Sequence, residues 1–309
     1  MTRRLNLSLL VLLVLIGGPF YWLLLDNRPA DAAPQPISIA ELRSLAAAIP
    51  GPGPSGIEAE LVAWHRVPGD LVAAGSGLKR RLIGVLAFRL PVQGRGPIVI
   101  DSGLTPAAAR ALHMEAYIQS RQELVDAALR SASTILVTGE QPEQLSGLLA
   151  QAAIAPGVLQ RARFNPLQLP PAPLASALPW PRGLALPRPT LDQGRPQAVA
   201  PGVVAIPAPS RTPGSQMIFV RLADGREYLF TGPIATLDQN WDPLRAPSHL
   251  LGLVSAVGDG RAVASWLRTI RALKNEDPQL TIIAGHDSDA IAWTKGHLGV
   301  QTHFAAGTD

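Results

Sequence analysis

A short polar turn after an apolar strand carries side chains that are well placed for chemistry. Residues 135–137 (Ile-Leu-Val) predict a buried strand, and the turn that follows holds Gln141, Glu143 and Gln144. A carboxylate can accept a proton or bind a cation, and an amide can both donate and accept hydrogen bonds. α/β proteins tend to place their ligand sites at the C-terminal ends of strands. This turn is therefore the first candidate site.

A second polar segment follows a strand near the C-terminus. Residues 280–283 predict that strand, and His286, Asp287 and Asp289 come after it. These three side chains could form an isolated site, but so could those of any acidic loop. No Gly-rich phosphate loop, Ser-x-x-Lys pair or nucleophile elbow stands out, and Ser210, Ser215 and Ser255 lack a recognisable base. The sequence therefore assigns no catalytic residue.

The elements that position these turns are predicted by periodicity and by end signals. Pro142 suits the first position of a helix, and Glu143 beside it fits a helix start. Thr105-Pro106 is an N-cap and first-position pair that opens a helical region to Ser131. Asp224-Gly225 predicts a hairpin turn. Further strands are predicted at 57–67, 81–90, 97–100, 158–164, 203–207, 217–222 and 227–230. A short helix is predicted at 37–48 and a longer one at 260–274.

The composition excludes several classes of protein. The 309 residues carry a net charge of only +4, and basic runs occur only at Arg3-Arg4 and at 79–81. Aromatic and basic residues do not interleave, so no nucleic-acid groove is expected. The chain has no Cys, which excludes disulfides, thiolate zinc sites and Cys nucleophiles. A core of ordinary size is expected because 47% of the residues are hydrophobic.

The N-terminal segment predicts a membrane anchor or a signal sequence. Leu5 to Leu25 runs for 21 residues without a charge, which is long enough to cross a bilayer. Arg3-Arg4 should remain in the cytoplasm, which places the rest of the chain outside it. Ala30-Asp31-Ala32 offers a cleavage site. The expected location is the inner membrane, single-pass, with the domain in the periplasm, or the periplasm alone if the segment is cleaved.

Five short landmarks occur in an order that resembles the metallo-β-lactamase superfamily. They lie between residues 57 and 287 and comprise an Asp-Ser-Gly strand end, a Thr-containing turn with Ser-Gly-Leu after it, a Thr-Pro-Gly-Ser turn, a Phe-Thr-Gly strand end and a Gly-His-Asp end. Their positions are 98–103, 138–148, 212–215, 229–232 and 284–287. The resemblance implies an αββα sandwich, in which two sheets pack inside and helices lie outside.

The resemblance also places the zinc ligands, and most of them are replaced. Of the implied ligand set only His286 is retained, with Glu143 as a candidate substitute for Asp. The remaining implied positions and their neighbours are occupied by Gly139, Gln141, Gln144, Arg211 and Pro233, and Asp287 follows His286. Zinc prefers imidazole, thiolate or carboxylate donors. The resemblance therefore implies a vacated pocket without zinc.

Arg211 leaves two interpretations open. A guanidinium in the place of a dication would repel metal and could bind an anion. Alternatively, Arg211 pairs with Glu143 or Glu140 and only fills space. His65, beside Trp64 on a predicted strand, is interpreted as structural.

Three segments are expected. Residues 1–28 form the anchor or signal, 29–54 a Pro/Ala-rich linker, and 55–309 the metallo-β-lactamase-like domain. Within that domain, residues 166–201 contain ten prolines and predict an inserted loop or flap. The flap either covers the domain or docks a partner.

The expected function is binding or scaffolding by a membrane-tethered protein that lacks zinc chemistry. Its candidate partners are the membrane, a small anionic ligand and another protein. The alternative is a hydrolase with a rearranged or single-metal site built on His286, Glu143 and Asp287, and zinc is expected only in that case.

Overall fold

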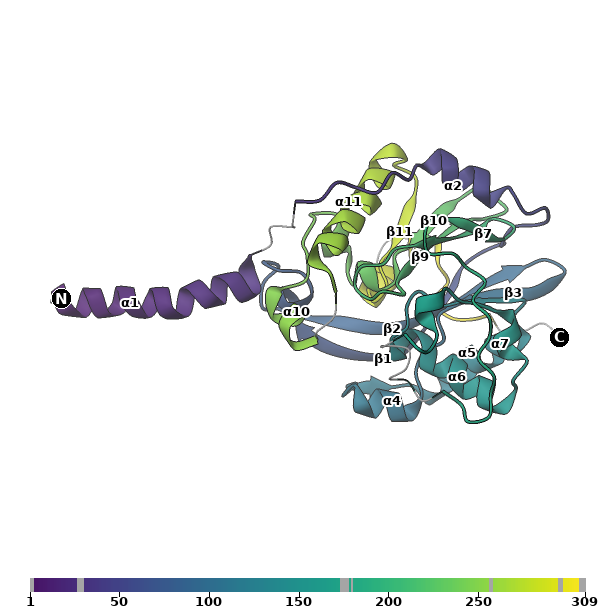
Figure 1. The fold of residues 1–309 in the computed structure, drawn as a ribbon, viewed down its shortest axis with the longest axis horizontal. Helices are drawn as coiled ribbons and strands as arrows, with labels where there is room; N and C mark the ends of the chain where they lie inside the picture. The colour runs from purple at the N-terminus through teal and green to yellow at the C-terminus, as the bar shows by residue number, and fades with distance from the viewer. Residues whose placement is uncertain are drawn as a thin grey trace.

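The computed structural model describes residues 3–26, 31–172, 178, 180–255, 258–293 and 297–305. Figure 1 shows two sheets with helices on their outer faces, and α1 (Arg3–Phe20) extends away from them. This is the αββα arrangement that the resemblance implied, so the predicted fold class is confirmed.

The first sheet joins an antiparallel half to a parallel half. Its strand order is β4-β1-β2-β3-β5-β6. β1, β2 and β3 pair antiparallel, whereas β3, β5 and β6 run parallel. The parallel half brings the C-terminal ends of β3 and β5 to one edge. The bounds are β1 (Glu58–Pro68), β2 (Arg80–Val92), β3 (Arg95–Ile100), β4 (Ala116–Tyr117), β5 (Thr134–Leu136) and β6 (Ala162–Arg163).

The second sheet has a similar mixed character. Its order is β11-β10-β9-β8-β7, and only β10 and β11 pair in parallel. The predicted turn at Asp224-Gly225 joins β9 to β10, which confirms the hairpin. The ends of β10 and β11 therefore also lie side by side. The bounds are β7 (Gln197–Ala200), β8 (Val203–Pro207), β9 (Gln216–Arg221), β10 (Glu227–Phe230) and β11 (Thr281–Ile283).

Three large apolar clusters fill the spaces between the layers, and two smaller ones lie beside them. The central cluster joins the inner faces of both sheets, with Phe88 of β2 edge-on to Phe230 of β10 at 4.9 Å between ring centroids. The second lies between the first sheet and the helices α5 (Gln119–Ser131) and α6 (Pro142–Ile154). The third lies between the second sheet and the helices α2 (Ile39–Ala46) and α11 (Gly260–Glu276). Each layer is thus held by its own buried apolar face.

The remaining helices are short and connect the layers. They are α3 (Gly69–Val72), α4 (Pro106–Ala111), α7 (Val158–Arg161), η2 (Pro166–Gln168), η3 (Gly232–Ile234), α9 (Asp238–Trp241), α10 (His249–Ser255), α12 (Ser288–Trp293) and η4 (His297–Gly299). The π-helical η1 (Tyr21–Leu25) follows α1 directly.

Two predicted elements were wrong. The helix expected from Thr105 to Ser131 is two helices, because His113 has a φ of 53° and β4 then pairs with β1. The strand expected at 158–164 is mostly the helix α7, and only β6 remains of it. In the first case pairing with a strand distant in sequence overrides the local helical pattern. In the second, only the residues that pair with β5 are a strand.

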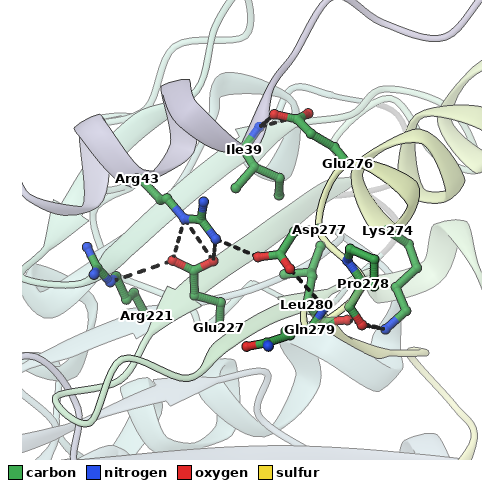
Figure 2. Close-up of polar contacts among 10 residues, drawn as sticks. All are labelled: Ile39, Arg43, Arg221, Glu227, Lys274, Glu276, Asp277, Pro278, Gln279 and Leu280. Atoms are coloured by element: carbon green, nitrogen blue, oxygen red, sulfur yellow. Dashed lines mark hydrogen bonds and ion pairs between the residues drawn. The ribbon is translucent and has the colours of Figure 1, made fainter.

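The helix α2 lies in the segment predicted as a linker and is bound to the second sheet (Figure 2). The backbone N–H of Ile39 donates to the Glu276 carboxylate at 3.1 Å. The Arg43 guanidinium donates to Glu227 at 2.7 Å and also contacts Asp277. Part of segment 29–54 is therefore packed on the domain.

The Pro-rich segment 166–201 is described at its two ends and over residues 180–196. Its residues Leu169 and Leu191 are buried, and the Trp180 ring packs against the second apolar cluster. Residues 173–177 and 179 lie outside the described part of the chain. The described part covers the domain surface as a packed segment.

The N-terminal helix is apolar and exposed. The span Arg3–Leu25 has 23 residues with a mean hydropathy of 2.3, and none of its most apolar window is buried. Its end contacts the domain: the Trp22 ring stacks on His249 at 4.8 Å, and the Gly75 N–H donates to the Leu24 carbonyl at 3.1 Å. A segment able to span a membrane therefore ends directly beside α10.

Candidate functional site

The turns that end β3 and β5 are locked together by one carboxylate. Asp101 has a φ of 61° and accepts hydrogen bonds from the Thr138 backbone N–H at 2.6 Å and from its hydroxyl at 2.7 Å. Burial raises the pKa of Asp101 to about 7, although both hydrogen bonds from Thr138 oppose the shift. A Cβ on Gly147 would lie 2.0 Å from the Ser102 carbonyl, so α6 needs a glycine there to approach this turn. The turn that carries Gln141 is thereby fixed.

The two sheets meet at this edge. The Gln216 N–H of β9 donates to the Thr138 carbonyl at 2.9 Å. A Cβ on Gly232 would lie 2.5 Å from the Thr138 Cβ, and one on Gly285 would lie 2.1 Å from the Gly232 carbonyl. The ends of β5, β10 and β11 therefore touch, and the predicted site residues on these turns come together.

Glu140 holds the loop that carries Arg211. Its buried carboxylate accepts from the Thr212 hydroxyl at 2.6 Å and from the Gly214 N–H at 2.9 Å. Burial raises the pKa of Glu140, and these hydrogen bonds oppose the rise. The carboxylate is occupied by the Thr-Pro-Gly-Ser turn, so Glu140 positions Arg211 without pairing with it.

A cavity of about 240 Å³ lies where these turns meet, and we call it the central cavity. Five of the residues singled out in the sequence line it: Gln141, Glu143, Arg211, Pro233 and His286. The other lining residues are His65, Val67, Leu71, Val72, Ile83, Val85, Met114, Thr236 and Leu251. The cavity is thus mostly apolar, with a small group of polar and charged side chains.

The other three candidate residues lie beside the cavity. A Cβ on Gly139 would be 3.3 Å from the Pro233 ring and 3.6 Å from the Gln144 side-chain oxygen. Gln144 is buried, and that oxygen has no hydrogen-bond partner among the described residues. Asp287 accepts from the backbone N–H groups of Asp238 and Ala290 at 3.1 and 3.0 Å. Its carboxylate therefore caps the start of α12, and both of its oxygens bind backbone N–H groups.

His65 lines the central cavity, although its position beside Trp64 in the sequence indicated only a structural role. It lies on β1 opposite Ile83 of β2, and both side chains line the cavity. Burial lowers the pKa of His65, the Glu143 carboxylate raises it and His286 lowers it. Its spacing in the sequence gives no ligand partner, because those partners come from other strands. No local signal could have identified it.

Glu143 and Arg211 are opposite charges without direct contact. Burial raises the pKa of Glu143, and the positive charges of His65 and Arg211 oppose this rise. One carboxylate oxygen of Glu143 has no hydrogen-bond partner, and Arg211 makes no hydrogen bond or ion pair with any part of the chain that the structure describes. Arg211 thus makes no direct ion pair with Glu140 or Glu143, although its charge interacts favourably with that of Glu143.

His286 is held in one tautomer. Its Nδ1 lies 2.8 Å from the Gly84 carbonyl, which can only accept, so Nδ1 carries the proton. Burial lowers the pKa of His286, the Gly84 contact raises it and Arg211 lowers it. The ring is therefore neutral at physiological pH, and its Nε2 lone pair is available as an acceptor.

The residues present do not match a dizinc centre. Across the described ranges, no three His, Asp or Glu side chains are grouped closely enough to hold a metal ion. Gly139 and Pro233 offer no side-chain donor, and Gln141 and Gln144 offer amides. The positive charge of Arg211 at the same cavity opposes a dication. This set of side chains suits an anion better than zinc.

Comparison with known proteins gives the fold. No protein-family model matches the chain, and no curated protein matches it. A quorum-quenching N-acyl homoserine lactone lactonase superposes with a TM-score of 0.57 at 13% identity, covering 79% of this chain and 96% of that one. An N-acyl homoserine lactone hydrolase with N-hexanoyl-L-homoserine at its catalytic metal centre superposes with a TM-score of 0.57 at 14% identity. The match covers 77% of this chain and 95% of that one.

A variant enzyme from B. thuringiensis, with N-decanoyl-L-homoserine bound at its active site, superposes with a TM-score of 0.56. It is 14% identical over 77% of this chain and 95% of its own. Likeness at such low identity carries the architecture and not the reaction. Together with the five landmarks in order, these matches show that the chain adopts the metallo-β-lactamase fold.

Proposed function

We propose that this protein is a membrane-tethered binding protein that holds a small anionic ligand in the central cavity. In this proposal the cavity has lost dizinc chemistry. The observation that carries it is Arg211, which lines the cavity and makes no hydrogen bond or ion pair with the described residues. A bound anion would add a counter-charge in direct contact and accept hydrogen bonds from two of its N–H groups at once.

The neighbours of Arg211 support an anion of a defined kind. Gln141 can donate from its amide, and Glu143 can donate when its carboxyl is protonated, which burial favours. His286 presents an acceptor to the same cavity. This set suits an oxyanion that also carries an O–H group, because the O–H can donate a hydrogen bond to Nε2 of His286. Hydrogen phosphate is such an anion.

The domain is proposed to lie outside the cytoplasm. The exposed apolar span Arg3–Leu25 supports tethering, because its side chains need an apolar surrounding. Arg3 and Arg4 at its start favour a cytoplasmic N-terminus. The location that follows is the inner membrane with the domain in the periplasm, or the periplasm alone after cleavage.

A hydrolase with a rearranged or single-metal site is the second candidate. It is favoured by one observation: His65, Glu143 and His286 all line the central cavity. These side chains would need to move closer together to share one metal ion. Chelator-sensitive ester or phosphodiester hydrolysis that His286→Ala abolishes would support this candidate.

Calorimetric titration tests the proposed function. The full chain in a neutral detergent is titrated with inorganic phosphate, and then with sulfate and acetate. Arg211→Gln should weaken phosphate binding by about tenfold or more, because a charge-assisted hydrogen bond pair is lost. Arg110→Gln, at an exposed arginine on α4, is the matched control and should bind like the unaltered chain. Equal binding by Arg211→Gln would contradict the proposal.

A further inference from the structure

A second cavity adjoins the central one on the side of the membrane helix. Its volume is about 370 Å³, and we call it the membrane-side groove. Arg211 and Leu251 line both the groove and the central cavity. Trp22, from the end of the apolar N-terminal span, forms part of its wall. Arg211 therefore lies between the central cavity and a groove whose wall includes Trp22.

The groove carries apolar side chains at the level where the anchor ends. Trp22 and Leu253 line it, and they are 50% and 65% exposed. Leu78, which is 61% exposed, lies on the turn whose Gly75 binds the Leu24 carbonyl. Tryptophan is enriched where membrane and water meet. Figure 1 shows α10 beside the end of the N-terminal helix. In the proposed membrane-tethered arrangement, this face of the domain lies next to the bilayer surface.

The described lining of the groove holds one arginine, Arg211, and one acidic residue, Asp26. The Asp26 carboxylate lies 3.9 Å from the His249 ring. His249 in turn stacks on Trp22. Arg211 at the inner end has no counter-charge in contact. A ligand in this groove would therefore contact the apolar side chains of Trp22 and Leu253 as well as Arg211.

We propose that the membrane-side groove admits the anionic headgroup of a membrane lipid, whose phosphate binds Arg211 while its acyl chains remain beside the anchor helix. This rests on the proposed function and names the ligand class for the same guanidinium. The anchor then does more than tether: it holds the groove at the height of the lipid headgroups. No bond is made or broken in this step.

Native mass spectrometry of the full chain tests the proposal. The protein is extracted in mild detergent, exposed to equal amounts of phosphatidylglycerol and phosphatidylcholine, and weighed with its retained lipid. We expect one phosphatidylglycerol per chain, retained about tenfold over phosphatidylcholine. Arg211→Gln should lose this preference. Leu253→Glu should lose it as well, because it places a negative charge at the mouth of the groove.

Two controls keep the result interpretable. Arg110→Gln and Leu124→Glu alter an exposed arginine and an exposed leucine on helices that do not line the groove, and both should retain the lipid. Phosphatidylglycerol retained equally by Arg211→Gln would overturn the lipid proposal. So would equal retention of both lipids by the unaltered chain.

Phosphate titration separates this proposal from the proposed function. Phosphate binding that depends on Arg211, without any preference for the anionic lipid, would overturn the lipid proposal alone. Failure of both phosphate and lipid to bind through Arg211 would overturn both proposals.

Discussion

At the residue scale, the central cavity differs from a dizinc centre because a positively charged side chain, Arg211, lines it. A dizinc site needs several neutral or negative donors pointing at one place, whereas here Arg211 and Glu143 face a common space with His65 and His286. Under the proposed function, the guanidinium of Arg211 selects an anion and the Glu143 carboxyl makes its affinity depend on pH.

Anion binding should strengthen as the pH falls below neutral. Burial raises the pKa of Glu143, so its carboxyl becomes neutral at a higher pH than an exposed glutamate does. Once neutral, it ceases to repel an anion and can donate a hydrogen bond. His65 and Arg211 face the same carboxyl and oppose the rise, and His65 adds a positive charge only at lower pH because burial lowers its pKa. Phosphate or sulfate titration at several pH values measures this.

The variant Glu143→Gln should bind the anion more tightly at pH 7 and show a flatter pH profile. The amide is neutral at every pH, so the repulsion is absent throughout. A profile in Glu143→Gln as steep as in the unaltered chain would assign the effect to another group.

Asp101 should make the protein less stable as the pH rises from 4 to 7. Its pKa is about 7 in the folded protein and about 4 in an unfolded chain, so the folded state binds the additional proton in this window. The free energy of unfolding therefore falls with rising pH. Asp101→Asn should remove this part of the slope, as measured by urea unfolding at each pH.

The control for Asp101 is an exposed carboxylate. Asp192→Asn, in the Pro-rich segment, should leave the slope unchanged, since the side chain is 66% exposed. A slope that persists in Asp101→Asn would mean that its burial does not retain the proton.

At the element scale, strand ends and helix starts could be predicted from the sequence, and pairings could not. Pro142 marks the start of α6, and Asp224-Gly225 marks a hairpin, because the signals are local. The break at His113 depends on β4 pairing with β1, and Asp287 turns away from the cavity because α9 supplies a backbone N–H. The presence of His65 in the site likewise depends on strand register. These are long-range contacts without a local signature.

The helix α2 should depend on Glu227 for its attachment. The buried Glu227 carboxylate pairs with Arg43, which also reaches Asp277 (Figure 2). Glu227→Gln should lower the free energy of unfolding by about 1–3 kcal/mol, because a charged hydrogen-bond acceptor is lost. Urea unfolding measures the loss, and faster amide exchange over residues 39–46 locates it.

A surface ion pair provides the comparison for α2. Asp224 and Arg226 pair at 2.8 Å with both side chains 49% exposed, so Asp224→Asn should cost roughly 0–1 kcal/mol. Equal losses in Glu227→Gln and Asp224→Asn would mean that the buried pair does not hold the helix.

At the scale of the whole molecule, the resemblance predicted the layers, whereas the adjacency of anchor and site came only with the structure. Ordered landmarks specify the sandwich because each marks a strand end in a known place. The stacking of Trp22 on His249 and the sharing of Arg211 by two cavities arise from the folded chain. The apolar N-terminal span, the groove and the central cavity therefore lie side by side, with Arg211 in the lining of both cavities.

The orientation of the domain can be tested because the chain has no Cys. Arg195→Cys introduces one thiol at a side chain that is 79% exposed. A membrane-impermeant maleimide should label it in cells whose outer barrier is opened but whose inner membrane is intact. Labelling only after full lysis would place the domain in the cytoplasm.

The most direct test of the central claim is metal content. The full chain is loaded with zinc, desalted and analysed by mass spectrometry for bound metal. We predict no stoichiometric zinc in the folded protein, because Arg211 and two amides stand where the resemblance places zinc ligands. One or two zinc ions per chain, lost in His286→Ala, would contradict the account and favour the hydrolase.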